Sequence, residues 1–278
     1  MRTTGRLIGV AVAALLLLAG CSSSGDGGSA SPDTTAAATT TAPAKPLRIL
    51  VTNDDGVGAE GIDALVEGLR TVPDVEVTVV APAENQSGKG GTTSPGVLVA
   101  SDATTKSGYA AKAVAGTPAD TIVWAIDQKG LDFTPDLVIS GINAGQNMGT
   151  ATELSGTVGA ARAAVTRGIP ALAASMGPLA GPWDWPSGVS YVLDWLSENR
   201  AAAADGTLPT TTVANLNVPT CTTGTVRGQI EVPVATNADK YNDPPNCTST
   251  ATDPADDITA YLDGFAPLSD LSATATPG

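Results

Sequence analysis

Short apolar runs alternate with amphipathic stretches along the middle of the chain. Runs rich in β-branched residues predict strands, at 47–52, 75–80, 136–140, 171–175 and 213–218, with a short one at 112–114. Apolar residues at helical spacing, such as Ile62, Leu65, Val66 and Leu69, predict helices, at 61–69, 118–127, 156–167 and 189–196.

This order of strands and helices predicts an α/β fold with a mostly parallel sheet and helices on both of its faces. From about residue 211 the pattern changes, because Thr, Gly, Pro and Asn dominate after an alternating run at 213–218. We therefore expect the last part of the chain to form a C-terminal extension of extended strands and long loops.

Three of the predicted strands end in polar segments, at 53–56, 82–88 and 140–145. The carboxyl ends of parallel strands meet at one edge of an α/β sheet, where ligands bind. The residues that we expect to converge there are Asp54, Asp55, Ser87 and Asn143. Two carboxylates, a hydroxyl and an amide form a hard oxygen set, which suits one divalent cation such as Mg²⁺ or Mn²⁺.

Each of these residues also has a simpler interpretation. Asp54 and Asp55 could form an Asx-turn before the first helix, or could share a proton instead of a cation. Asn143 could be a turn residue between two glycines. Ser87 could ligate the cation, cap a loop or act as a nucleophile. The chain contains no His, so a Ser-His-Asp arrangement is excluded.

An anion site is expected where the helix at 156–167 begins, because free backbone N–H groups and the helix dipole favour negative charge there. The alternative for this segment is an ordinary N-cap. Together with the cation site it favours hydrolysis of a phosphate ester, with Asp54 and Asp55 as catalytic residues and Asp54 as base or nucleophile. We assign substrate or phosphate binding to Asn53, Asn147, Ser155, Gly156 and Thr157.

Trp183 and Trp185 could stack on a nucleobase, but such residues more often pack down a loop.

The N-terminal segment is typical of a bacterial lipoprotein. Basic residues Arg2 and Arg6 precede an apolar run at 7–19 that is too short to span a bilayer comfortably, and Gly20 and Cys21 follow it. We expect a signal peptide at 1–20, lipidation of Cys21 and a low-complexity tether at 21–46. The folded domain is then 47–271 with a disordered tail at 272–278, and its location is extracytoplasmic, bound to the membrane only through the lipid.

Charge and cysteine content restrict the partners further. The full chain has a net charge of −14, and loss of the two signal-peptide arginines makes it 12 − 28 = −16. We therefore expect no binding to nucleic acid polymers, and an anionic substrate would need a local cation. With Cys21 lipidated, Cys221 and Cys247 remain, and an even pair in an oxidising compartment predicts a disulfide, with two free thiols as the alternative.

Five ordered motifs resemble the SurE family of survival-protein nucleotidases and cover nearly all of 47–271. They are Ile49–Gly56, Val80–Pro82 with Asn85–Gly88, Gly116–Asp120, Ser140–Gly149 and Ser155–Ala161, and weaker echoes at Leu216–Pro219 and Asp257–Leu268 extend the resemblance to the end of that range. The resemblance implies a Rossmann-like three-layer α/β/α core and a metal-dependent phosphatase of nucleoside 5′- or 3′-monophosphates. It places the cation ligands on the same Asp54, Asp55, Ser87 and Asn143, and it implies a C-terminal extension that mediates homodimers or tetramers.

The chain departs from the family pattern near the expected site. Many members have His where this chain has Gly58, and Pro where it has Glu60; Ala151 and Leu154 replace residues that are often acidic and aromatic. These differences bear on substrate preference more than on the cation ligands. The alternatives are a broad acid phosphatase or exopolyphosphatase, a tethered protein that binds a phosphorylated ligand without turnover, and a structural lipoprotein.

Overall fold

The structure is a computed structural model that describes residues 45–274. The expected signal peptide, the lipidated Cys21, the tether as far as residue 44 and the end of the tail lie outside the described residues. Across residues 45–274, no helix has the length and apolar character needed to cross a membrane.

The described residues form a nine-stranded sheet in the order β3-β4-β2-β1-β5-β6-β7-β9-β8. All neighbours from β4 to β7 are parallel, as are β9 and β8, whereas β3–β4 and β7–β9 are antiparallel. The prediction of a mostly parallel α/β sheet is confirmed. The strands are β1 (Leu47–Thr52), β2 (Val75–Pro82), β3 (Ala100–Thr104), β4 (Ala110–Val114), β5 (Leu137–Ala144), β6 (Ala171–Met176), β7 (Thr212–Val218), β8 (Gln229–Glu231) and β9 (Ala266–Ser272).

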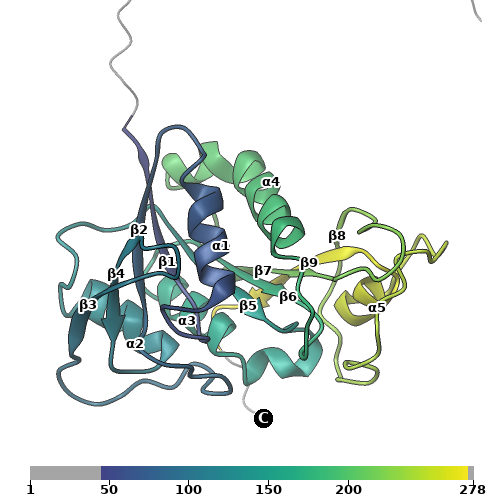
Figure 1. Ribbon diagram of the computed structural model, residues 1–278, viewed down its shortest axis with the longest axis horizontal. Coiled ribbons are helices and arrows are strands. Elements are labelled where there is room, and N and C mark those ends of the chain that lie inside the picture. The colour runs from purple at the N-terminus through teal and green to yellow at the C-terminus, as the bar shows by residue number, and fades with distance from the viewer. Residues whose placement is uncertain (1–44, 275–278) are drawn as a thin grey trace, which may run out of the picture. The chain divides into compact units, whose positions relative to one another are not determined.

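Helices cover both faces of this sheet (Figure 1). Successive residues of β1 point to opposite faces, so Ile49 and Val51 belong to one apolar core and Leu50 to the other. The first core lies beneath α1 (Glu60–Leu69) and α4 (Trp185–Ala204), and the second beneath α2 (Pro118–Ile122) and α3 (Gly156–Val165). The remaining helical segments are η1 (Val123–Asp127), η2 (Gly149–Glu153) and α5 (Asp257–Leu262).

The structure corrects the expected boundaries at four places. The hairpin β3–β4 replaces a single short strand, and α4 is longer than 189–196 at both ends. The tail contains α5 between β8 and β9, although only strands and loops were expected there. Strand β5 runs on to Ala144 instead of ending at Ser140, with a register shift against β6 between Ser140 and Asn143. Gly141 permits this continuation, because a Cβ at its φ of +148° would lie 2.4 Å from the carbonyl oxygen of Ala174.

The C-terminal extension, residues 219–265, packs beside the carboxyl end of the central strands (Figure 1). The disulfide Cys221–Cys247 joins two of its loops, with Cα atoms 5.8 Å apart. A small apolar cluster of Met148, Ala235, Ile258 and Tyr261 connects the extension to the segment that follows β5. The extension is thus packed against the edge where the candidate residues gather.

Candidate functional site

The site begins with a tight turn after β1. The Asn53 side chain closes this turn, because its Nδ2 donates to the Gly56 carbonyl (2.9 Å) and its Oδ1 accepts from the Gly56 N–H (3.2 Å). Gly56 has a φ of +102°, which favours glycine. Both polar atoms of Asn53 are therefore used inside the turn, where they shape the site instead of facing a substrate.

Asp54 is the most buried carboxylate of the site, with 3% of its surface exposed. The Thr157 hydroxyl donates to its Oδ1 at 2.7 Å. Burial raises the pKa of Asp54 from 3.8 to about 6, and the neighbouring Asp55 charge adds to the rise, while the bond from Thr157 opposes it. A carboxyl group held this way gains from any positive charge placed beside it.

Asp55 connects the ends of three strands. The Ala144 N–H, at the end of β5, donates to Asp55 Oδ2 at 3.0 Å, and the Asn85 amide, in the loop after β2, lies 3.4 Å from Oδ1. Burial raises the pKa of this carboxyl as well. The polar segments that follow β1, β2 and β5 therefore lie together at one sheet edge.

Ser87 and Asn143 are placed at this edge by their neighbours. The Gln86 N–H donates to the Asp54 carbonyl oxygen (2.7 Å), which holds the loop carrying the exposed Ser87 against the turn. Asn143 is 7% exposed, and its Nδ2 donates to the Gly145 carbonyl oxygen at 2.7 Å. This bond fixes the orientation of the amide and leaves Asn143 Oδ1 as the acceptor.

The start of α3 lies directly against Asp54. A Cβ on Gly156 would lie 2.7 Å from Asp54 Cβ and 2.9 Å from Asp54 Oδ2. Ser155 acts as the N-cap, since its hydroxyl accepts from the Val158 N–H at 3.1 Å, and the Thr157 hydroxyl is bonded to Asp54. Both hydroxyls thus hold the site together, and the donors left for an anion are the Ser155 O–H, which only accepts in the N-cap bond, and the first backbone N–H groups of the helix.

Asn147 lies in a polar cluster behind the site. Its Nδ2 donates to the Ser175 hydroxyl (2.8 Å), and its N–H donates to Asn217 Oδ1 (2.7 Å). Its carbonyl oxygen accepts from the amides of Asn215 and Asn217 at 2.9 and 3.0 Å. In this structure Asn147 anchors its loop to β6 and β7. The sequence reasoning missed the part played by Asn217, for which the only signal was a weak motif echo at 216–219.

The two tryptophans support the packing interpretation. Trp183 and Trp185 stack on one another with ring centroids 5.4 Å apart. The Trp183 indole donates to the Pro178 carbonyl oxygen, and the Trp185 indole lies 3.4 Å from a Glu60 carboxylate oxygen. Both rings therefore pack down the loop before α4.

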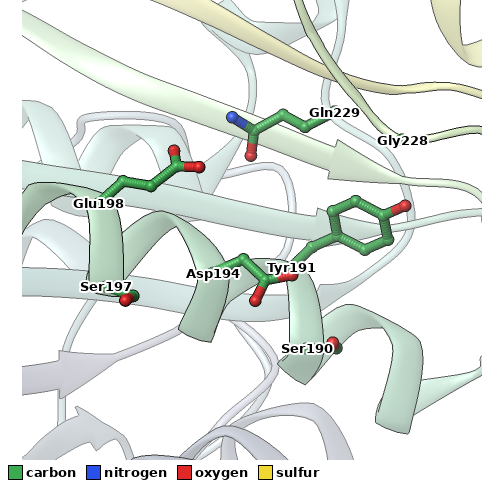
Figure 2. Close-up of a pocket in the computed structure, with 7 residues that line it drawn as sticks. All are labelled: Ser190, Tyr191, Asp194, Ser197, Glu198, Gly228 and Gln229. Carbon is green, nitrogen blue, oxygen red and sulfur yellow. The ribbon is translucent and has the colours of Figure 1, made fainter.

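A cavity of about 490 Å³ lies elsewhere, between α4 and residues 228–229 (Figure 2). Its lining includes Tyr191, Asp194 and Glu198 of α4. None of the strand-end residues belongs to it. The candidate site is thus recognised by the convergence of its side chains and not by the shape of a cavity.

The donor set suits a hard divalent cation. Within residues 45–274 no three His, Cys, Asp or Glu side chains gather into a metal site, so a cation at this edge would be held by two carboxylates together with neutral oxygens. Such an ion would offset the cost of ionising two adjacent carboxyl groups, one buried and one half-buried, whose pKa values are both raised. Oxygen-only sets of this kind favour Mg²⁺ or Mn²⁺ over softer metals.

An open, mostly parallel sheet with paired carboxylates at its carboxyl edge, beside a helix N-terminus, defines a Rossmann-like α/β protein with a candidate ligand site at that edge. The family model for survival protein SurE matches residues 49–241. The chain belongs to the SurE family.

Relatives and a solved structure agree with this membership. The chain is 37% identical over 188 residues to the 5′-nucleotidase SurE of Vibrio parahaemolyticus, covering 68% of each chain. It is 49% identical over 136 residues to the 5′-nucleotidase SurE of Carboxydothermus hydrogenoformans, covering 48% of this chain and about half (51%) of that relative. The crystal structure of the SurE protein from Aquifex aeolicus has a TM-score of 0.64 and 26% identity, and the match covers 82% of this chain and 94% of that one.

Proposed function

We propose that this protein is a metal-dependent phosphomonoesterase that converts nucleoside monophosphates to nucleoside and phosphate. The observation that carries the proposal is the meeting of Asp54 and Asp55 with the N-terminus of α3, bonded through Thr157. Relatives named 5′-nucleotidase support the substrate class and favour the 5′ position. Hydrolysis of 3′-monophosphates at the same site is part of the proposal.

The cation would be held by Asp54, Asp55, Ser87 and Asn143. When bound, it would polarise the phosphoryl group and neutralise the charge that develops on its oxygens. The protein's own contribution is positioning: the Thr157 hydroxyl fixes Asp54, and the Ala144 N–H fixes Asp55. The first N–H groups of α3 are oriented to receive phosphate oxygens, and Asp54 is the buried carboxylate placed to take up the proton of the attacking water.

A substrate panel tests this proposal. Phosphate release is measured with Mn²⁺ or Mg²⁺ from nucleoside 5′- and 3′-monophosphates, p-nitrophenyl phosphate and polyphosphate. We expect cation-dependent turnover of the nucleotides that is lost in Asp54→Asn and Asp55→Asn. Asp102→Asn is the matched control, because Asp102 lies in the edge strand β3, remote from the site, and pairs only with Lys112.

The outcomes separate the alternatives. Faster turnover of p-nitrophenyl phosphate or polyphosphate than of any nucleotide would favour a broad phosphatase or exopolyphosphatase. Nucleotide binding by calorimetry without phosphate release would favour a tethered binding protein. The mechanism would be refuted if turnover persisted after divalent ions were chelated. It would also be refuted if both Asp54→Asn and Asp55→Asn kept their turnover.

We also propose that the protein is anchored outside the cytoplasm through lipid on Cys21, which lies outside the described residues. The support is the sequence pattern of the first 46 residues alone. The test is partition into the detergent phase of a Triton X-114 extract, which Cys21→Ala should abolish.

The family resemblance further suggests a homodimer or tetramer, which light scattering of the purified protein would measure.

A further inference from the structure

The C-terminal extension contacts both ends of the segment that follows β5. At its start, the Tyr241 hydroxyl donates to the Gln146 carbonyl oxygen, and Gln146 Nε2 donates to the Tyr241 carbonyl oxygen at 2.8 Å. At its end, the Gly149 N–H donates to Asp257 Oδ2 at 2.9 Å. Residues 145–149 are therefore held by the extension at Gln146 and Gly149, and by β6 and β7 at Gly145 and Asn147.

Asp257 is built into this contact, and among residues 45–274 no Lys or Arg forms an ion pair with it. It is fully buried, and its oxygens accept three backbone N–H groups, from Gly149, Ala235 (2.8 Å) and Ile258 (2.9 Å). A buried carboxylate is expensive unless such donors satisfy it. The fit around Gly149 is close, because a Cβ there would lie 2.3 Å from the Asn237 carbonyl oxygen.

The held segment leads directly to the candidate site. The Gly145 carbonyl oxygen accepts from Asn143 Nδ2 at 2.7 Å, so the position of Gly145 determines which way the Asn143 amide points. Gly145 adjoins Gln146, the residue that Tyr241 holds. On the other side of Gly145, the Ala144 N–H binds Asp55. A shift of this segment would therefore move the donor to Asp55 and the amide of Asn143 together.

We infer that Tyr241 and Asp257 are positioning residues, which act through the 145–149 segment to orient the Asn143 amide oxygen toward the cation. This inference rests on the proposed function. It adds that the C-terminal extension, although it contributes no ligand, sets the affinity of the site. Loss of either contact loosens the end of the segment that it holds and weakens cation binding, while Asp54 keeps its bond to Thr157.

The test compares two tyrosines in the full-length protein. Tyr241→Phe removes the hydroxyl bond to Gln146, and Tyr109→Phe is the matched control. Tyr109 is also half-buried and also donates its hydroxyl to a backbone carbonyl, that of Val77 at 2.7 Å, away from the carboxyl ends of the strands. The two changes should lower the unfolding temperature to a similar extent, but only Tyr241→Phe should weaken Mn²⁺ binding measured by calorimetry, by about three- to tenfold.

Hydrogen exchange provides a second readout that does not depend on the cation. In the metal-free protein, the Asn147 and Gly149 amides should exchange faster in Tyr241→Phe and in Asp257→Asn, and at the wild-type rate in Tyr109→Phe. Unchanged exchange in Tyr241→Phe, or Mn²⁺ affinity that falls equally in both tyrosine variants, would overturn the inference. If the wild type binds no Mn²⁺, the proposed function fails, and the exchange rates alone decide whether the extension holds the segment.

Discussion

Replacing Asp54 by Asn should stabilise the metal-free protein while removing its proposed function. Burial raises the pKa of Asp54 to about 6 in the folded state, against 3.8 when it is exposed. The folded protein therefore binds more protons than the unfolded chain between these two pH values, and its stability falls as the pH rises through about 6. The asparagine side chain removes the charge and keeps an oxygen that can accept the Thr157 hydroxyl.

The expected magnitude follows from the pKa difference. At about 1.4 kcal/mol per pKa unit, the buried charge costs about 3 kcal/mol at pH 7.5. Because Asp54 is almost fully buried, solvent does little to screen this cost. At pH 4.5 most of the cost has disappeared, since the wild-type carboxyl is then protonated in the folded state, and about 1 kcal/mol remains.

The assay is urea unfolding in EDTA at pH 7.5 and at pH 4.5. Asp54→Asn should be more stable than the wild type at pH 7.5, by an amount that shrinks at pH 4.5. Asp127→Asn is a control of opposite sign, because hydrogen bonding to Arg167 lowers the pKa of Asp127 below 3.8. That variant should lose stability at both pH 7.5 and pH 4.5, since the wild-type carboxyl stays ionised at both.

Adding Mn²⁺ should reverse the order of stabilities at pH 7.5. The cation stabilises the wild type by about 4.1 kcal/mol at a thousandfold excess over its Kd, which exceeds the advantage of Asp54→Asn, and that variant should gain far less. The reasoning is refuted if Asp54→Asn is no more stable than the wild type in EDTA at pH 7.5, or if the difference between them does not change with pH.

The other contacts of the site make further predictions. Thr157→Val leaves Asp54 Oδ1 without its donor and should weaken Mn²⁺ binding on the order of tenfold by calorimetry, whereas Thr157→Ser should retain most of the affinity. Gly156→Ala places a Cβ against Asp54 and should lower the free energy of unfolding by about 1–3 kcal/mol, with a larger loss of phosphate release. Replacing Cys221 and Cys247 together by Ser should cost about 3–4 kcal/mol of stability in the chain-entropy model; the wild type under reducing conditions should match the variant, and an unchanged unfolding temperature would contradict this.

Local pattern was sufficient to predict the central sheet and the strand ends that form the site. The runs at 47–52 and 171–175 are bounded by turn residues and buried on both faces, so period and length identify them without tertiary information. The family motifs supported the same strand ends. The location of Asp54 and Asp55 could be predicted from their position in the sequence, because residues that directly follow a central parallel strand lie at the carboxyl edge of the sheet.

The parts that sequence reasoning missed depend on contacts between distant residues. Nothing local shows that the Thr157 hydroxyl would turn toward Asp54, because the same residue at the start of a helix could equally face an anion. In the sequence, Gly141 resembles the end of a strand. Strand β5 nevertheless continues beyond Gly141, because β6 pairs with β5 as far as Ala144. Helix α5 escaped notice because it is short and lies in a segment rich in loop residues.

The arrangement of the site explains why a protein would keep two acidic groups side by side. Asp54 is fixed by Thr157 and Asp55 by the Ala144 N–H, while the Asn53 bonds to Gly56 lock the turn that carries both carboxylates. In residues 45–274 no Lys or Arg forms an ion pair with either carboxylate. The neutral donors hold the geometry without neutralising the charge, so the repulsion persists until a cation or a proton arrives. That uncancelled repulsion drives cation binding, and an internal salt bridge that removed it would make the fold more stable and the site weaker.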